Sequence, residues 1–339
     1  MSLPAMLNAY LCASVIALAN LAAGAPCSET VAIAGGGPPD SEIPAVLSTN
    51  AAKELQLALF LENLEVSFFN MGLTNFTESN ANGYPNDTLQ VVKKVAAQEV
   101  VHVESLINLL DDYGIPTIPP CNYSFSVNST KTFLDLAHMI GSVGIGATIG
   151  LTERLAATDP LLVKTLSSIL TVESRHDAFF RSVNGEVPNP TPFDTGISGL
   201  WAYNLALSFV VSGSCPVELP LPILPGLTVT QPTSVSYTKR SEAPYANITQ
   251  SPPQLEFTWD PSQAPFAAES GKQLLIGWVN QLNVPVYTPV NTTATGKGTT
   301  YIPRGMNGVA FAVLTSQVFE NVNDLAFGTI AGPAFVALS

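Results

Sequence analysis

Charged residues and histidines are scarce in this chain. Only 12% of its 339 residues are charged, and 13 basic residues face 26 acidic ones, which gives a formal net charge of -13. An acidic protein of this kind repels nucleic acid and anionic lipid, so neither is an expected partner. The chain holds three histidines and no Gly-x-Ser-x-Gly sequence. The sequence therefore does not indicate a hydrolase with a catalytic triad.

Basic residues are also missing before an apolar run at residues 11–23. This run and the small residues that follow it are nevertheless typical of a secretory signal peptide, here residues 1–25. A membrane anchor is the alternative, but the run is short for a span, and no later segment is typical of a transmembrane helix. Six Asn-x-Ser/Thr sequons fit a secreted, glycosylated protein of the extracellular space or cell wall. They begin at Asn75, Asn86, Asn122, Asn128, Asn247 and Asn291.

Cysteine is rare as well, with four residues in the chain. Cys12 would leave with the signal peptide. Cys121 begins the connection between two expected helices and Cys215 ends the helical region, so a disulfide between them would clamp that connection to the helices. Cys27 would then be free or paired elsewhere.

The hydrophobic pattern changes twice along the chain and predicts an α+β protein. Residues 26–44 are rich in Gly and Pro and are expected to be extended. Residues 45–215 carry helical spacing of apolar residues, interrupted by Gly, Pro and Asp at loops, which predicts a four-helix bundle plus a fifth helix. Residues 216–339 contain short alternating runs between turn residues, which predicts a small β-sandwich.

Two of the three histidines lie in the same four-residue frame, Glu-x-x-His, which begins at Glu99 on the second helix and at Glu173 on the fourth. Residues i and i+3 share one helix face, so each frame directs a carboxylate and an imidazole the same way. Together with one Glu from each of the other two helices, such frames form the di-metal centre of ferritin-like bundles. The two frames therefore predict Glu99, His102, Glu173 and His176 as candidate metal ligands.

The first helix supplies a fifth candidate. Glu62 and Glu99 lie at similar distances from the loop between their helices, which puts them at one level of an antiparallel pair. Glu65 lies one turn away and is the reserve. On the third helix the equivalent level falls at residues 141–146, where no acid is present. His138 would reach the site only in a different register.

Residues 45–215 resemble the ferritin-like domain of fungal stress-response proteins and plant desiccation-related proteins. The motifs that carry the resemblance are Leu61-Glu62-Asn63-Leu64-Glu65, Gln98-Glu99-Val100-Val101-His102-Val103, Ser142-Val143-Gly144-Ile145-Gly146-Ala147 and Ile169-Leu170-Thr171-Val172-Glu173-Ser174-Arg175-His176. Many members of the wider family carry a glutamate at the position of Gly141. The resemblance thus implies a partial carboxylate–histidine site.

The expected function is that of a stress- or development-associated extracellular protein with redox chemistry at its metal site. The alternatives for the cofactor are iron or manganese, as one ion or a pair, or no metal at all. The other hypothesis is a non-enzymatic protein whose bundle is a scaffold and whose β-rich part binds a cell-wall or matrix component. A ferritin-type cage is not expected, because glycans and a fused domain would hinder shell packing.

Overall fold

The computed structural model describes residues 26–75, 83–230, 254–263 and 271–338. They divide into two compact units, and each is described by itself. The first unit comprises the residues up to Gly144, Gly150–Pro188 and Ala206–Pro220. The second comprises Ile145–Ile149, Asn189–Leu205 and the residues from Leu221 onward. The predicted signal peptide and Asn247 lie outside the described residues.

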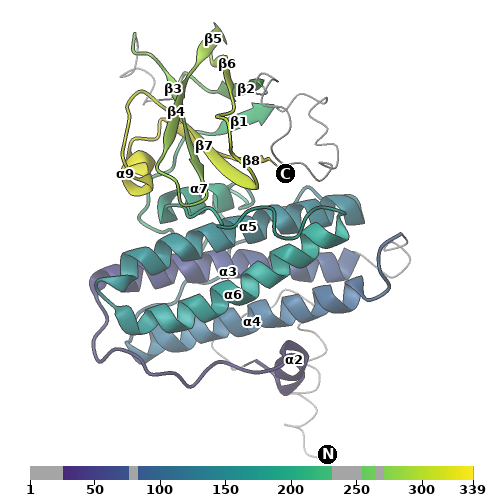
Figure 1. The fold of residues 1–339 in the computed structure, drawn as a ribbon. Helices are drawn as coiled ribbons and strands as arrows, with labels where there is room; N and C mark the ends of the chain where they lie inside the picture. Colours follow the sequence, from purple (N-terminus) through teal and green to yellow (C-terminus); the bar gives the residue numbers. More distant parts are fainter. Residues whose placement is uncertain (1–25, 76–82, 231–253, 264–270, 339) are drawn as a thin grey trace, which may run out of the picture. The chain divides into compact units, whose positions relative to one another are not determined.

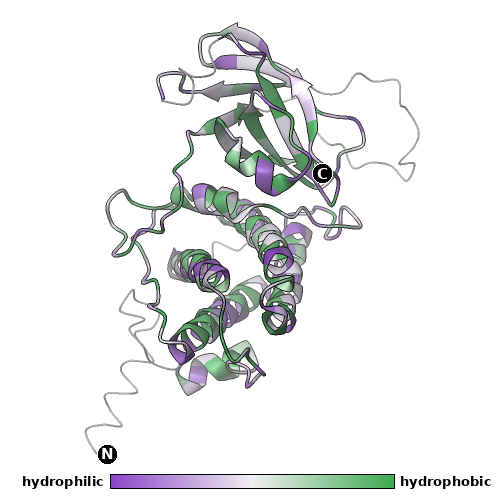
Figure 2. Cartoon of the chain, turned by 90° about the vertical axis from the view of Figure 1, so that its left-hand side faces the viewer, coloured by the Kyte–Doolittle hydropathy of each residue, from purple (hydrophilic) through white to green (hydrophobic). Residues whose placement is uncertain are grey.

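Four long helices make up most of the first unit (Figure 1). They are α3 (Thr49–Asn75), α4 (Thr88–Asp112), α5 (Thr130–Ala156) and α6 (Pro160–Val183). A short helix, α2 (Ser28–Ala34), precedes them within the segment that was expected to be extended. That expectation was wrong because the Gly/Pro-rich stretch only begins after Ala34. Figure 2 shows hydrophobic and hydrophilic residues on different sides of the long helices, as expected for helices that share a buried core.

Local chemistry fixes where these helices begin. Ser129 and Thr132 form a reciprocal capping box at the start of α5, and Pro160 occupies the first turn of α6. The hydroxyl of Ser48 accepts a hydrogen bond from the backbone N–H of Ala51 and so caps α3. α5 is long and apolar enough to cross a membrane by composition, but most of it is buried, as in the core helix of a soluble bundle.

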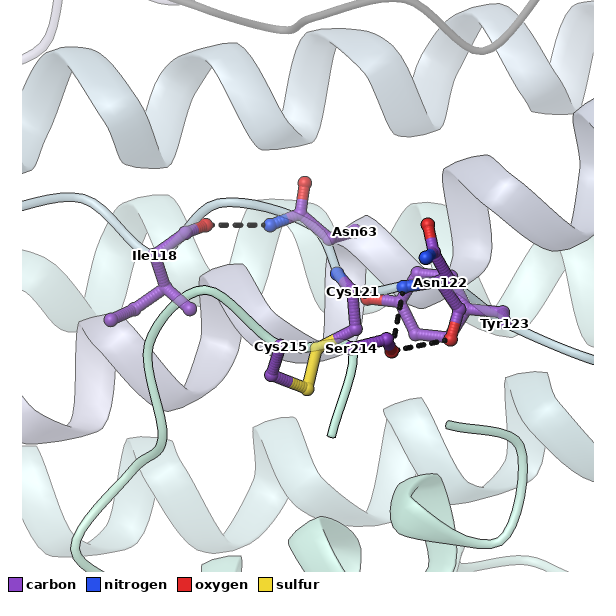
Figure 3. Close-up of a disulfide and its surroundings, with 7 residues drawn as sticks. All are labelled: Asn63, Ile118, Cys121, Asn122, Tyr123, Ser214 and Cys215. Atoms are coloured by element: carbon purple, nitrogen blue, oxygen red, sulfur yellow. Dashed lines mark hydrogen bonds between the residues drawn. A yellow bond between two sulfur atoms is a disulfide. The ribbon is translucent and has the colours of Figure 1, made fainter. Parts of the chain in front are cut away.

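A long crossover joins α4 to α5, and a disulfide holds it in place (Figure 3). The disulfide links Cys121 to Cys215, the pair that the sequence favoured. Beside it, the Ser214 hydroxyl accepts from the backbone N–H of Asn122 at 3.1 Å. The amide of Asn63 on α3 donates to the Ile118 carbonyl at 2.9 Å. Cys27 is also disulfide-bonded.

The second unit contains two four-stranded antiparallel sheets, with strand orders β1-β2-β6-β5 and β4-β3-β7-β8. Their bounds are β1 Leu227–Thr230, β2 Gln254–Trp259, β3 Leu275–Asn280, β4 Val286–Pro289, β5 Asn291–Ala294, β6 Lys297–Tyr301, β7 Val309–Thr315 and β8 Ala331–Ala337, with helix α9 (Val322–Phe327) before β8. Phe257 of one sheet meets Trp278 of the other edge to face at 5.9 Å, within one core. The predicted sandwich of alternating strands is confirmed.

The fifth helix, α7 (Gly199–Leu207), belongs mostly to this second unit rather than to the bundle with which the sequence grouped it. Its Trp201 is fully buried, and the indole N–H donates to the hydroxyl of Thr329 at 3.0 Å. The helix is apolar nearly all round, and that pattern does not reveal which neighbour buries it.

Candidate metal centre

Three helices of the bundle bring the predicted ligands together in its interior. Glu62 comes from α3, Glu99 and His102 from α4, and Glu173 and His176 from α6. Glu62, Glu99, His102 and Glu173 each offer one ligand atom, and these four atoms all lie within 4.8 Å of one another. Glu99 is 0% exposed. The two Glu-x-x-His frames thus converge on one buried point, as their spacing predicts.

Glu99 and Glu173 each extend one oxygen toward each imidazole. Glu99 places Oε2 3.0 Å from Nδ1 of His102 and Oε1 3.0 Å from Nδ1 of His176. Glu173 places Oε1 2.9 Å from the first nitrogen and Oε2 3.4 Å from the second. Glu62 Oε2 lies 3.7 Å from Nδ1 of His102 only. Two carboxylates that face two imidazoles in this way are placed to bridge a pair of ions.

Several of these atoms are buried without a hydrogen bond. Within the described residues, the buried side-chain atoms that lack a partner include Glu62 Oε2, Glu99 Oε1, Glu173 Oε1 and His176 Nδ1. Their short separations therefore do not satisfy hydrogen-bond geometry. Buried polar atoms are normally paired, since desolvation is otherwise uncompensated. Glu99 Oε2 and His102 Nδ1 form one hydrogen bond at 3.0 Å within the cluster. The four unpaired atoms converge without such a bond, which fits a shared cation.

The ionisation of the cluster shows what the metal-free protein must do instead. Burial raises the pKa of Glu62 to about 7, although the nearby His102 opposes the shift. Burial works against protonation of His176, but Glu173 and Glu99 outweigh it and raise its pKa to about 10. The pKa of Glu173 is lowered because both imidazoles overcome the effect of burial. Protons on the imidazoles thus balance the carboxylates where a metal would.

Gln98 orients His176, a role that sequence reasoning missed. The Gln98 amide nitrogen donates to the carbonyl of Ala34 at the end of α2, so its oxygen faces the imidazole. That oxygen accepts from Nε2–H of His176 at 2.8 Å. With its proton on Nε2, the neutral ring presents the Nδ1 lone pair to the cluster, which is the tautomer that a metal requires. The sequence offered one indication of this role, because Gln98 directly precedes the candidate ligand Glu99 in the second motif.

The third long helix contributes no ligand, but the position that faces the cluster differs from the expected one. A Cβ atom at Gly141 would meet Asp177 at 3.6 Å, whereas a Cβ atom at Gly144 would lie 2.7 Å from Oε1 of Glu65. Gly144 lies within residues 141–146, the level inferred from the turn distances, whereas Gly141, the position that the family resemblance suggested, faces Asp177. The reserve candidate Glu65 is buried against Gly144.

The other reserve candidate, His138, is engaged elsewhere. Its Nδ1 lies 2.6 Å from Asp177 Oδ1, and its Nε2 accepts from the buried Arg181 guanidinium at 3.0 Å. With both ring nitrogens occupied, His138 belongs to a separate polar network between α5 and α6. Glu104, at a different face of α4 from the cluster, is buried, and burial with nearby Asp111 raises its pKa.

Residues 50–186 match the family model of the ferritin-like domain. The helical unit is therefore a ferritin-like domain, which the four-helix topology and the paired frames support independently. The chain is also similar to Protein rds1 of Schizosaccharomyces pombe, with 27% identity over 328 residues that cover 83% of this chain and 79% of that protein. The predicted resemblance to a fungal group of ferritin-like proteins is confirmed.

Proposed function

We propose that the bundle binds a pair of redox-active metal ions, iron or manganese, between α3, α4 and α6. The observation that carries this proposal is the symmetric placement of Glu99 and Glu173, each with one oxygen toward each imidazole. Carboxylates and neutral imidazoles suit iron, manganese and zinc, and of these only the first two change oxidation state in proteins. A bound pair would supply electron transfer with oxygen or peroxide as the oxidant.

The residues have distinct roles in this proposal. Glu99 and Glu173, which each face both imidazoles, would hold the ions together with Nδ1 of His102 and Nδ1 of His176. Glu62 would add a carboxylate beside His102. Burial of these groups excludes bulk water and strengthens each charge interaction. Gln98 keeps the proton of His176 on Nε2, away from the ligating nitrogen.

The cellular part of the proposal is a secreted, glycosylated protein associated with stress or development. Its support is the apolar leader, the six sequons and the similarity to the fungal relative. In the described residues, Asn75, Asn86, Asn122, Asn128 and Asn291 are all exposed. Mass spectrometry of protein from the culture medium, before and after enzymatic removal of N-glycans, tests this; protein that is retained in cells at its unglycosylated mass would overturn it.

Metal analysis of the purified protein tests the central claim. We expect iron or manganese near two equivalents in the wild type and a loss of most of it in the Glu99→Ala/His176→Ala variant. Glu104→Gln is a matched control, because it removes a buried carboxylate of α4 outside the cluster. Equally negligible metal in wild type and double variant after reconstitution would refute the proposal and favour the scaffold hypothesis.

A further inference from the structure

The ferritin-like arrangement places one carboxylate ligand on the third long helix. Here that helix is α5, and neither of its acidic residues, Asp135 and Glu153, belongs to the cluster of Glu62, Glu99, His102 and Glu173. Among the glycines of α5, Gly144 is the one that faces Glu65. A Cβ atom at this glycine would lie 2.7 Å from Oε1 and 3.8 Å from Cδ of Glu65. The carboxylate of Glu65 thus occupies the space into which a side chain at position 144 would project.

Glu65 belongs electrostatically to the cluster. It is only 6% exposed. Burial raises its pKa, and the carboxylates of Glu173, Glu99 and Glu62 raise it further. Glu65 is thus a fourth acidic group in the same part of the interior, although it is not one of the four residues whose ligand atoms lie within 4.8 Å of one another. A buried carboxyl group among like charges is held protonated when no cation is bound, and a bound cation would favour its ionised form.

We infer that Glu65 is a metal ligand, a carboxylate that α3 supplies in place of the one that α5 lacks. The inference rests on the proposed metal site. Glu62 and Glu65 are three residues apart, so both lie on the face of α3 that meets the cluster. Gly144 is then the complement of Glu65, because any larger residue would fill the volume that the Glu65 carboxylate needs.

The charge count supports the same assignment. Two divalent ions carry four positive charges, while Glu62, Glu99 and Glu173 together supply three negative ones. Neutral imidazoles add none. Glu65 as a carboxylate makes the site neutral, which a buried ion cluster requires to avoid a large desolvation cost.

Moving the carboxylate from one helix to the other tests the inference. The variants are Glu65→Ala, Glu65→Gln and the double variant Glu65→Ala/Gly144→Glu, with Glu104→Gln as the control. Metal content and affinity for Mn²⁺ and Fe²⁺ are measured by competition titration, and folding is checked by circular dichroism. We expect both single variants to lose one equivalent or to bind at least about tenfold more weakly. The double variant should regain the wild-type stoichiometry, since its new side chain enters the vacated space.

The outcomes separate this inference from the proposed function. A wild type that binds metal while both Glu65 variants bind it equally well would overturn the role of Glu65 and leave the site intact. A Glu65→Ala loss that the double variant fails to restore, in a folded protein, would overturn the replacement of an α5 ligand. A wild type that binds no metal would refute both. Glu65→Gln, which conserves side-chain volume, guards against a loss caused by a cavity.

Discussion

The proton on His176 links helix α2 to the candidate metal site. The Ala34 carbonyl holds the Gln98 amide, and the Gln98 oxygen holds the Nε2–H of His176. Each step is a single hydrogen bond with a fixed direction, because a carbonyl can only accept. The orientation of one ligand therefore depends on a residue that never contacts the metal.

Removal of this support should weaken metal binding. We expect Gln98→Ala to lower metal affinity about 10- to 100-fold, as for other residues that orient a ligating histidine. The free ring could then protonate Nδ1 or rotate. Gln90→Ala, at an exposed position of the same helix, is the control and should change nothing. Isothermal titration with Mn²⁺ measures both, and equal affinities would show that the orienting bond is dispensable.

Two glycines of the long helices should respond oppositely to alanine. At Gly72 an added Cβ would lie 2.3 Å from the Phe133 ring, which is itself stacked on Phe68 at 4.8 Å. We expect Gly72→Ala to destabilise the protein by about 1–3 kcal/mol through overpacking. At Gly141 the nearest contact is 3.6 Å, so alanine fits and should stabilise by up to about 1 kcal/mol through helix propensity. Urea denaturation measures both, and destabilisation of similar size in the two would contradict the packing at Gly72.

At this scale the sequence predicts contacts within a helix better than contacts between helices. The spacing of Glu99 and His102 is sufficient to predict that they meet. The equally short contact between Glu99 and His176 depends on the register of α4 against α6, which no local rule determines. The same limit explains why counting residues from a turn gives only a range, 141–146, for the position on the third helix, and this range contains both Gly141 and Gly144.

At the scale of elements, Asp159 ties the beginnings of two helices together. Its carboxylate accepts from the backbone N–H of Ser48 at 3.0 Å and from the Ser48 hydroxyl at 2.5 Å, while its own carbonyl accepts from Leu162 in α6. Burial opposes ionisation, but these bonds to Ser48 prevail and lower the pKa of the carboxyl. Residue 159 is thus more than the cap of α6 that its sequence position suggests.

This arrangement predicts a pH-dependent contribution to stability. Because the folded pKa is depressed, the contribution is fully present above the unfolded value near 4 and is lost as the pH falls through the lower folded value. We expect Asp159→Asn to cost about 1–3 kcal/mol at pH 7, as for hydrogen bonds to a charged group. The difference from wild type should shrink below pH 4. Urea unfolding at a series of pH values measures it; a difference independent of pH would exclude the ionised carboxylate as its source.

Helices and strands with a strong periodicity of apolar residues could be predicted from the sequence. Elements whose formation or placement depends on neighbouring parts of the fold could not. The four long helices and the sandwich strands follow from repeated apolar spacing. The short α2 helix has only seven residues, too few for a periodic signal, and tertiary contacts stabilise it. α7 was found as a helix, but its uniformly apolar sequence did not indicate which unit buries it.

At the scale of the whole molecule, the chain differs from a protein built only to form a shell. A ferritin-like domain accounts for residues 50–186, and a separate sandwich unit follows it. Shell assembly requires bare bundle surfaces that pack on identical copies in closed symmetry. Here a second unit is fused to the bundle, and four exposed sequon asparagines lie within the helical unit, at Asn75, Asn86, Asn122 and Asn128.

We therefore expect no cage-like assembly. Light scattering coupled to size exclusion should give a mass that corresponds to one or a few copies of the 35.7 kDa chain, once glycan mass is subtracted. Enzymatically deglycosylated protein is the informative comparison. If it also stays small, the fused unit alone prevents shell packing; if it assembles, the glycans are the barrier. A large, uniform particle formed by the untreated protein would contradict the prediction, because glycans attached at the four sequons of the helical unit would leave little surface free for the contacts that a shell needs.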